Sequence, residues 1–190
     1  MAYYAWSATD RRASIMMNFF DCLHRGKAFG VTGNRASIAS GQQIGIQLFN
    51  PTLKQDNESI TAYVKSVTVW SETATFCAMV LFNTRLATTI INGKNLANED
   101  FPTTTNAISQ LVVTSEESAV VSAAGGAIKQ VRLPDSGSHT FSNPEWITKL
   151  PRGDNTLAGI NTGTGLLLSF NTIPAGKYVG AYFDWVEVNP

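Results

Sequence analysis

Charged side chains are scarce in this sequence, and several other residue types are almost absent. Only 15% of the 190 residues are charged, and 14 basic residues balance 14 acidic ones. Proteins that bind nucleic acid or an anionic membrane surface through charge carry an excess of Lys and Arg. The sequence has no such excess, so we expect neither nucleic acid nor a membrane among its partners.

Cysteine is also rare, and its two copies have no recognised spacing. Cys22 and Cys77 each lie among apolar neighbours without a C-x-x-C motif. We therefore expect neither a disulfide framework nor a metal site, although a single Cys22–Cys77 disulfide stays open. No segment approaches the roughly 18 apolar residues that a membrane-spanning helix needs. Asn18 and Asp21 interrupt the apolar residues after Arg11-Arg12, which argues against a signal peptide.

Catalytic motifs are missing from the sequence. The two histidines, His24 and His139, lie far apart, and no H-x-H, H-E-x-x-H or G-x-S-x-G pattern is present. Acidic pairs occur at Glu99-Asp100 and Glu116-Glu117, whereas glycosidases hold two carboxylates ~5 to 10 Å apart across a cleft. We therefore expect no catalytic residues, no metal ligands and no cofactor, and predict that the protein is not an enzyme.

Three short motif matches are better explained by local backbone chemistry. Arg152-Gly153-Asp154 matches an integrin-binding tripeptide, and Asn57-Glu58-Ser59 matches a glycosylation acceptor. Three-residue matches arise easily by chance, and both segments suit polar turns or loops. Gly163-Thr164-Gly165 lacks the lysine of a phosphate-binding loop, so we expect a turn before a strand there.

The sequence does contain many short segments with β periodicity. In residues 43–49, Ile44, Ile46 and Leu48 fall on one face of a strand. Further strand-like segments lie at 27–31, 60–70, 74–82, 108–113, 119–122, 127–133, 163–170 and 177–188. Turns are expected at 32–34, 40–41 and 71–73, and mostly loop at 134–154. Such spacing predicts a mainly β fold over residues 26–190, an antiparallel β-sandwich of jelly-roll or Ig type.

The first 25 residues depart from this β pattern. Residues 10–25 have an apolar stripe at helical spacing, which predicts one short amphipathic helix. Aromatic residues precede that helix and need a surface to cover them, either in the same chain or in another subunit. We therefore predict that residues 1–25 form an N-terminal arm. Its candidate interface residues are Tyr3, Tyr4, Trp6, Ile15 and Phe19.

The C-terminal segment is apolar on both faces of the strand that it predicts. After a turn at Ile173-Pro174-Ala175-Gly176, one face carries Val179, Ala181, Phe183 and Trp185 and the other Tyr178, Tyr182, Val186 and Val188. Segment 74–82 is also apolar on both faces. Two such strands need more cover than one core between sheets provides. We predict that Phe183 and Trp185 fill the core, while Tyr178 and Tyr182 contact another subunit.

A sugar-binding surface is the alternative explanation for several aromatic residues. Its candidate members are Trp70, Trp146, Tyr178, Tyr182 and Trp185. Such a platform requires exposed, coplanar rings with Asn or Asp side chains nearby. Packing in the core or between subunits explains the same residues without a ligand.

Several short motifs occur in a definite order from residue 26 to residue 188. They are Gly-Lys-Ala-Phe-Gly at 26–30, a Gly-Gln turn and a strand ending in Asn-Pro at 41–51, a Val-rich strand at 60–70, and the closing turn and strand that ends in Asp184-Trp185-Val186-Glu187. This layout resembles a class of small virion proteins of tailed bacteriophages. Residues 52–57 replace the Gly/Ser-rich turn usual in that class.

The resemblance implies a non-enzymatic structural protein that assembles in many copies on a capsid, neck or tail. Its location would be the virion. Its partners would be further copies of itself and other virion proteins, such as capsid, collar or tail subunits. The alternative is a tail-fibre, receptor-binding or carbohydrate-binding β-sandwich module.

Overall fold

The described part of the chain consists of β-strands and turns. In the computed structural model this part comprises residues 28–51, 61–84, 86, 89–92, 94–95, 110–116, 126–142, 148–150 and 162–188, and no helix occurs in these ranges. The mainly β prediction is confirmed. The predicted arm and helix of residues 1–25 lie outside the described residues.

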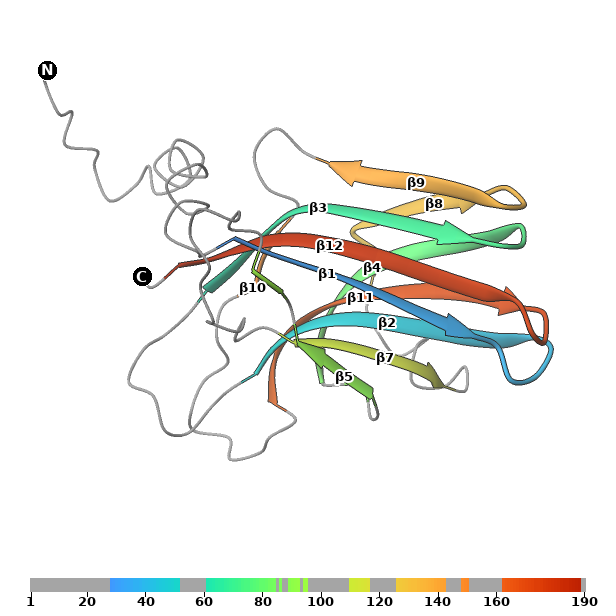
Figure 1. Ribbon diagram of the computed structural model, residues 1–190, viewed down its shortest axis with the longest axis horizontal. Coiled ribbons are helices and arrows are strands. Elements are labelled where there is room, and N and C mark those ends of the chain that lie inside the picture. The colour runs from blue at the N-terminus through green and yellow to red at the C-terminus, as the bar shows by residue number, and fades with distance from the viewer. Residues whose placement is uncertain are drawn as a thin grey trace, which may run out of the picture.

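The described part of the chain contains twelve strands, which form two antiparallel sheets of six strands each (Figure 1). The first sheet contains β1 (Ala28–Ala36), β3 (Thr61–Ser71), β6 (Lys94–Asn95), β9 (Gly137–Ser142), β10 (Thr148–Leu150) and β12 (Tyr178–Val188). The second sheet contains β2 (Gln42–Pro51), β4 (Thr75–Thr84), β5 (Thr89–Asn92), β7 (Gln110–Glu116), β8 (Lys129–Leu133) and β11 (Thr162–Ile173). Four longer strands dominate each sheet: β1, β3, β9 and β12 in the first, and β2, β4, β7 and β11 in the second.

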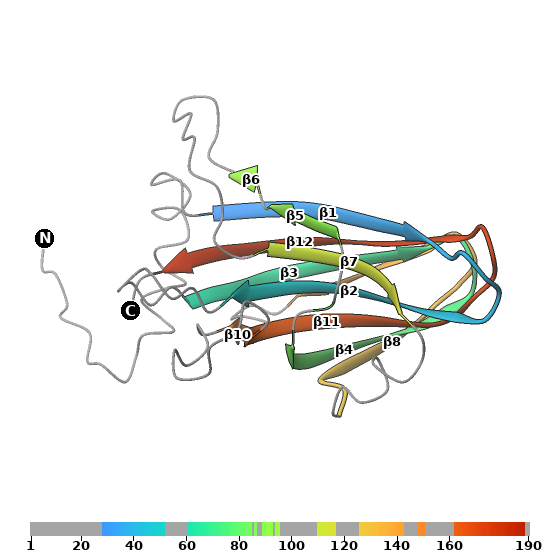
Figure 2. The ribbon, with the colours of Figure 1, turned by 90° about the horizontal axis from the view of Figure 1, so that it is seen from below.

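Strand order within the sheets follows a nested pattern. The first sheet has the order β10-β3-β12-β1-β6. Strand β9 also pairs with β3, at the residues that follow those paired with β10. The second sheet has the order β5-β7-β2-β11-β4-β8. Consequently β1 pairs with β12, β2 with β11, β3 with β9 and β4 with β8. The β1–β2, β3–β4, β8–β9 and β11–β12 turns gather at one end of the sandwich (Figures 1 and 2).

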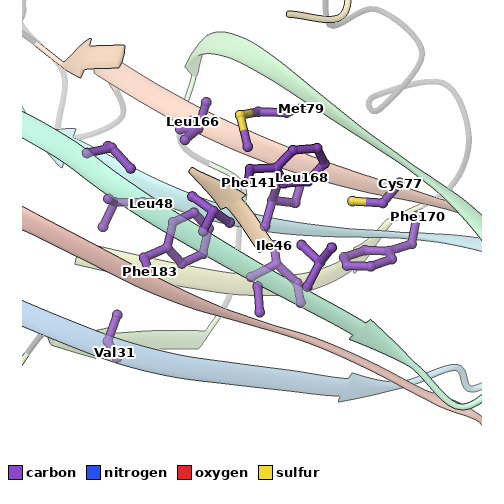
Figure 3. Packing of buried hydrophobic residues seen from close by; sticks show 14 of the residues in the cluster. Val31, Ile46, Leu48, Cys77, Met79, Phe141, Leu166, Leu168, Phe170 and Phe183 are labelled. Carbon is purple, nitrogen blue, oxygen red and sulfur yellow. The ribbon is translucent and has the colours of Figure 1, made fainter. Parts of the chain in front are cut away.

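The core lies between the two sheets and is built from alternating residues of their strands. Phe183 and Trp185 of β12 have no exposed surface, as predicted. The Trp185 ring stacks on Phe29 of β1 with centroids 5.9 Å apart. Figure 3 shows side chains from both sheets meeting in this layer, among them Phe170 and Phe183. Burying such side chains stabilises the fold by about 1.5–3 kcal/mol each.

Cys77 belongs to the same core. It is a free, fully buried thiol, and burial raises its pKa because the thiolate would lose its hydration. Its side chain therefore contributes packing like a small apolar residue. Cys22 lies outside the described residues.

A second apolar cluster covers the outer face of the second sheet. Phe49 of β2, Val80 of β4 and Leu167 of β11 pack together beneath Leu86. Both faces of segment 74–82 are thus covered in part by residues of the same chain. Phe76 and Leu81 of the same strand stay 52% and 45% exposed.

Two of the turn predictions were wrong, and the predicted loop at 134–154 contains β9 and β10. Residues 32–34 continue β1, where Gly33 is buried opposite Ala181 of β12. Residues 163–165 belong to β11, and a Cβ at Gly165 would lie 2.8 Å from the Phe82 carbonyl oxygen. Pairing with β12 at Gly33 and close packing against β4 at Gly165 override the turn propensity of these glycines.

Candidate interaction face

Three aromatic side chains lie next to one another in the strand register on the outer face of the first sheet. Tyr178 and Tyr182 alternate along β12 with core residues, so both point away from the core. Tyr178 is 46% exposed, and Tyr182 is half-buried. Trp70 of β3 is also half-buried and lies opposite Gly180, between these two tyrosines in the strand register. We call Tyr178, Trp70 and Tyr182 the aromatic row.

Trp70 lies across its neighbouring strand because position 180 has no side chain. A Cβ at Gly180 would overlap the indole, with the Trp70 Nε1 only 2.6 Å away. Real Cβ atoms do not approach ring atoms so closely. Gly180 therefore lets the indole cover the β12 backbone, which places a large ring on the outside of the sheet.

Small polar side chains surround the aromatic row. On β1, exposed Thr32 lies opposite Tyr182 and exposed Asn34 lies opposite Gly180. On the other side, the hydroxyls of Thr68 and Thr140 are hydrogen-bonded at 2.9 Å. These groups offer both donors and acceptors without charge. The central part of the face is therefore neutral and suited to hydrogen bonding.

Asp184 supplies the negative charge next to Tyr182 on this face. Its Oδ2 lies 3.9 Å from Nζ of Lys65, whereas its Oδ1 is buried without a hydrogen-bond partner among the described residues. Burial raises the pKa of Asp184, while Lys65 and the Ser66 hydroxyl oppose that shift. Burial and the Asp184 charge together raise the pKa of Tyr182.

Hydrogen bonds between turns fix the end of the face that carries Tyr178. The Tyr178 N–H donates to the Glu72 carboxylate at 3.1 Å, and the Glu72 N–H donates to the Tyr178 carbonyl at 3.0 Å. The N–H of Ser37 donates to the Lys177 carbonyl at 2.9 Å, and the N–H of Gly176 donates to the Ser37 carbonyl at 2.9 Å. These bonds connect three of the four turns and hold in place the end of the aromatic row that carries Tyr178.

The other aromatic and histidine candidates do not join this face. Trp185 is in the core, and His139 lies exposed on β9, where its ring meets Phe141 edge-on at 4.7 Å. The candidates outside the described residues are Tyr3, Tyr4, Trp6, Ile15, Phe19, His24 and Trp146.

The remaining sequence motifs give no assembled site. Within the described ranges, no three His, Cys, Asp or Glu side chains are close enough to hold a metal ion. Glu116 belongs to β7. The other motifs lie outside the described residues: 57–59, Glu99-Asp100, Glu117 and 152–154.

The sequence patterns did not assign Asn34, Thr32 or Asp184 to an interaction face. Their place on this face follows from pairing between β1, β12 and β3, which brings together residues far apart in the chain. The alternation within 178–188 was the available signal for Asp184, since it shares a face with Tyr178 and Tyr182.

The geometry of this face suits non-covalent recognition. The large aromatic rings supply apolar area, and their neutral neighbours supply directional hydrogen bonds. Among the residues that the structure describes, no helix is long and apolar enough to cross a membrane. No known protein family, curated protein or solved structure matches this chain.

Proposed function

We propose that the sandwich is a jelly roll. A jelly roll folds a long antiparallel hairpin over itself, so that early strands pair with late ones in a nested order. The β1–β12, β2–β11, β3–β9 and β4–β8 pairs support this assignment. An Ig-type sandwich instead places its first and last strands in different sheets. Strands β5, β6 and β7 form an insertion between the fourth and fifth strands of the jelly roll.

The proposed function is that of a structural subunit of a bacteriophage virion, present in many copies and without enzymatic activity. Jelly rolls are common in viral capsid proteins, although lectins and cupins share them. The sequence resemblance to small phage virion proteins favours the first of these classes. A decorating or connecting role on the head or neck is our first choice, and a tail-fibre role is the second.

The observation that carries this proposal is the aromatic row. Its three rings lie on the outer face of the first sheet, whereas the residues on the inner face of that sheet are already buried in the core. Aromatic rings with polar tips are enriched at subunit interfaces because each buries a large apolar area. We propose that a neighbouring copy covers Tyr178, Trp70 and Tyr182. The N-terminal arm, with Tyr3, Tyr4, Trp6, Ile15 and Phe19, would add a second attachment.

Light scattering coupled to size-exclusion chromatography tests this assignment. The full chain should elute as an oligomer. Tyr182→Ala should lower the mass of the eluting particle, while its circular dichroism spectrum stays the same as that of the wild type. Phe76→Ala is the matched control, because it removes an exposed ring from the outer face of the other sheet. An oligomer unaffected by Tyr182→Ala and Tyr178→Ala would contradict the proposed interface.

A glycan-binding module is the second candidate, and the position of Trp70 favours it. A flat indole on a sheet, with Asn34 and Thr32 nearby, offers a sugar both a stacking surface and hydrogen bonds. A monomeric protein that binds neutral glycans on an array would support this candidate over the structural one, provided that Trp70→Ala abolishes the binding.

A further inference from the structure

Strand β9 forms an edge of the first sheet. It pairs with β3 from Gly137↔Ser71 to Ser142↔Ser66, and no strand of the described part pairs with its other side. In Figure 1 it lies at the upper margin of the sandwich, near β8, which is an edge of the second sheet. Among the described residues, the backbone N–H and C=O groups on the outer side of β9 therefore have no strand partner, and they have the geometry to pair with a further strand.

β9 lacks the features that normally prevent such pairing. Its sequence, Gly-Ser-His-Thr-Phe-Ser, contains no Lys, Arg, Asp, Glu or Pro. Its register with β3 runs over six residue pairs without a bulge. Proteins protect edge strands with charged residues, proline or bulges, and β9 has none of these.

The neighbouring edge strand β8 provides an internal comparison. It carries Lys129 and Arg132, and Pro134 follows it directly. Two copies of β8 brought together would place like charges side by side, which opposes association. Two copies of β9 would meet without like charges, so β9 is the self-compatible edge on this side of the sandwich.

We propose that β9 is a self-association edge, at which the first sheets of two copies join in one continuous antiparallel sheet. The partner is a second copy of this chain, related by a two-fold axis perpendicular to the sheet. This contact is separate from the aromatic row, which lies on the face of the sheet and not at its edge. It rests on the edge geometry alone and does not require the proposed virion function.

The two-fold relation fixes the environment of His139. In such a pairing, residues that face the core in one copy lie opposite residues that face the core in the other. Of the registers that meet this condition, His139↔His139 and His139↔Phe141 pair the most residues of the two β9 strands. In the first register the two His139 Cβ atoms would be about 5 Å apart, and in the second about 7 to 8 Å on the diagonal. His139 is exposed, so changing it leaves the core intact.

An edge contact of this length is small, so the association is expected to be weak. Standard interfaces bury about 1,600 Å², and a single pair of short strands buries much less. A second contact between the same copies would raise the effective affinity through multivalency. Sedimentation over a wide range of protein concentration is therefore the suitable measurement.

A charge-exchange experiment at position 139 tests the proposal. His139→Glu and His139→Lys should each weaken self-association, by about tenfold, because like charges then face each other near the axis. An equimolar mixture of the two variants should restore association, since opposite charges would pair. Ser40→Lys, at an exposed turn, should leave association unchanged.

Cross-linking gives a second readout that does not depend on affinity. In a Cys22→Ser background, a cysteine at the position that meets its own copy should form a disulfide between copies on mild oxidation, because opposed strand residues approach the required spacing. That variant is His139→Cys in the His139↔His139 register and Thr140→Cys in the His139↔Phe141 register. Ser40→Cys should not. A wild-type chain that stays monomeric at all concentrations, with no cross-link from either cysteine variant, overturns the proposal. If Tyr182→Ala abolishes the oligomer while the mixture and the cross-link fail, the virion interface stands and the β9 edge does not.

Discussion

At the scale of single residues, Trp70 and Gly180 show how two distant positions fit each other. The indole of β3 occupies the space that a side chain at position 180 would need. Neither residue alone reveals this in the sequence, because glycine suggests a turn or bulge and tryptophan suggests core. Only the pairing of β3 with β12 places one over the other.

The Gly180→Ala variant should destabilise the fold. The added methyl group overlaps the indole and must displace it, which costs about 1–3 kcal/mol. Chemical denaturation measures this loss. Gly126→Ala is the control, because a Cβ there would meet nothing within 4 Å. In a Trp70→Ala background the cost of Gly180→Ala should shrink, and a cost unchanged by that background would contradict the packing explanation.

Asp184 should make stability depend on pH. Because burial raises its pKa in the folded state, the folded chain holds this proton more tightly than the unfolded chain. The stabilisation from protonated Asp184 is complete below the ordinary aspartate pKa. It is lost as the pH rises through the higher pKa that Asp184 has in the folded chain. Asp184→Asn should therefore be more stable than wild type at pH 7.

The advantage of Asp184→Asn should disappear in acid, below about pH 3.9, where both states are protonated in the wild type. Urea denaturation at the two pH values measures both differences. An Asn variant less stable than wild type at pH 7 would mean that Lys65 and Ser66 outweigh the burial of the carboxylate.

At the scale of strands, local alternation predicted much of the architecture. Segments 43–49, 60–70, 74–82 and 177–188 were located because each has regular apolar periodicity, and each is a strand. The β9 strand was missed because Ser, His and Thr give it weak periodicity, and its place depends on pairing with β3. Short edge strands of this kind depend on their neighbours more than on their own sequence.

Gln47 also depends on neighbours that the sequence does not reveal. This buried side chain of β2 donates from Nε2 to the Phe82 carbonyl at 3.3 Å and accepts at Oε1 from the Leu86 N–H at 3.0 Å. It thereby fastens Leu86 over the outer apolar cluster of the second sheet. The alternation in 43–49 placed Gln47 away from the core but gave no indication of a covering segment.

Gln47→Ala should release this cover. The loss of the buried hydrogen bond from the Leu86 N–H and of the part-buried one to the Phe82 carbonyl should cost about 2–4 kcal/mol. Hydrogen exchange should also show faster exchange at the Leu86 amide. Gln130→Ala, at an exposed position of β8, should change neither quantity. Equal exchange at Leu86 in wild type and Gln47→Ala would show that the side chain does not hold the segment.

At the scale of the whole molecule, the sequence indicated a sandwich but could not choose between jelly-roll and Ig topologies. That choice depends on which distant strands pair, and the spacing of segments does not contain it. The same limit applies to the interaction face. Tyr178 and Tyr182 were predicted from one strand, whereas Trp70 and Asn34 reach them only through the sheet.

Removing residues 1–25 should reduce oligomer mass without unfolding the sandwich. We expect this because the arm carries apolar and aromatic residues that the proposed assembly uses, while the core cluster of the described residues begins at Phe29. Light scattering and thermal denaturation of the full and shortened chains measure the two effects. Equal masses for both chains would contradict a role for the arm.

The most direct test of the proposed interface is hydroxyl-radical footprinting of the aromatic row. At concentrations where light scattering finds an oligomer, labelling of Trp70 and Tyr182 should fall severalfold relative to the dilute protein. Phe76, on the opposite sheet, should be labelled equally in both samples. Equal labelling of Trp70 and Tyr182 in the oligomer and the dilute protein would show that no neighbouring copy covers this face.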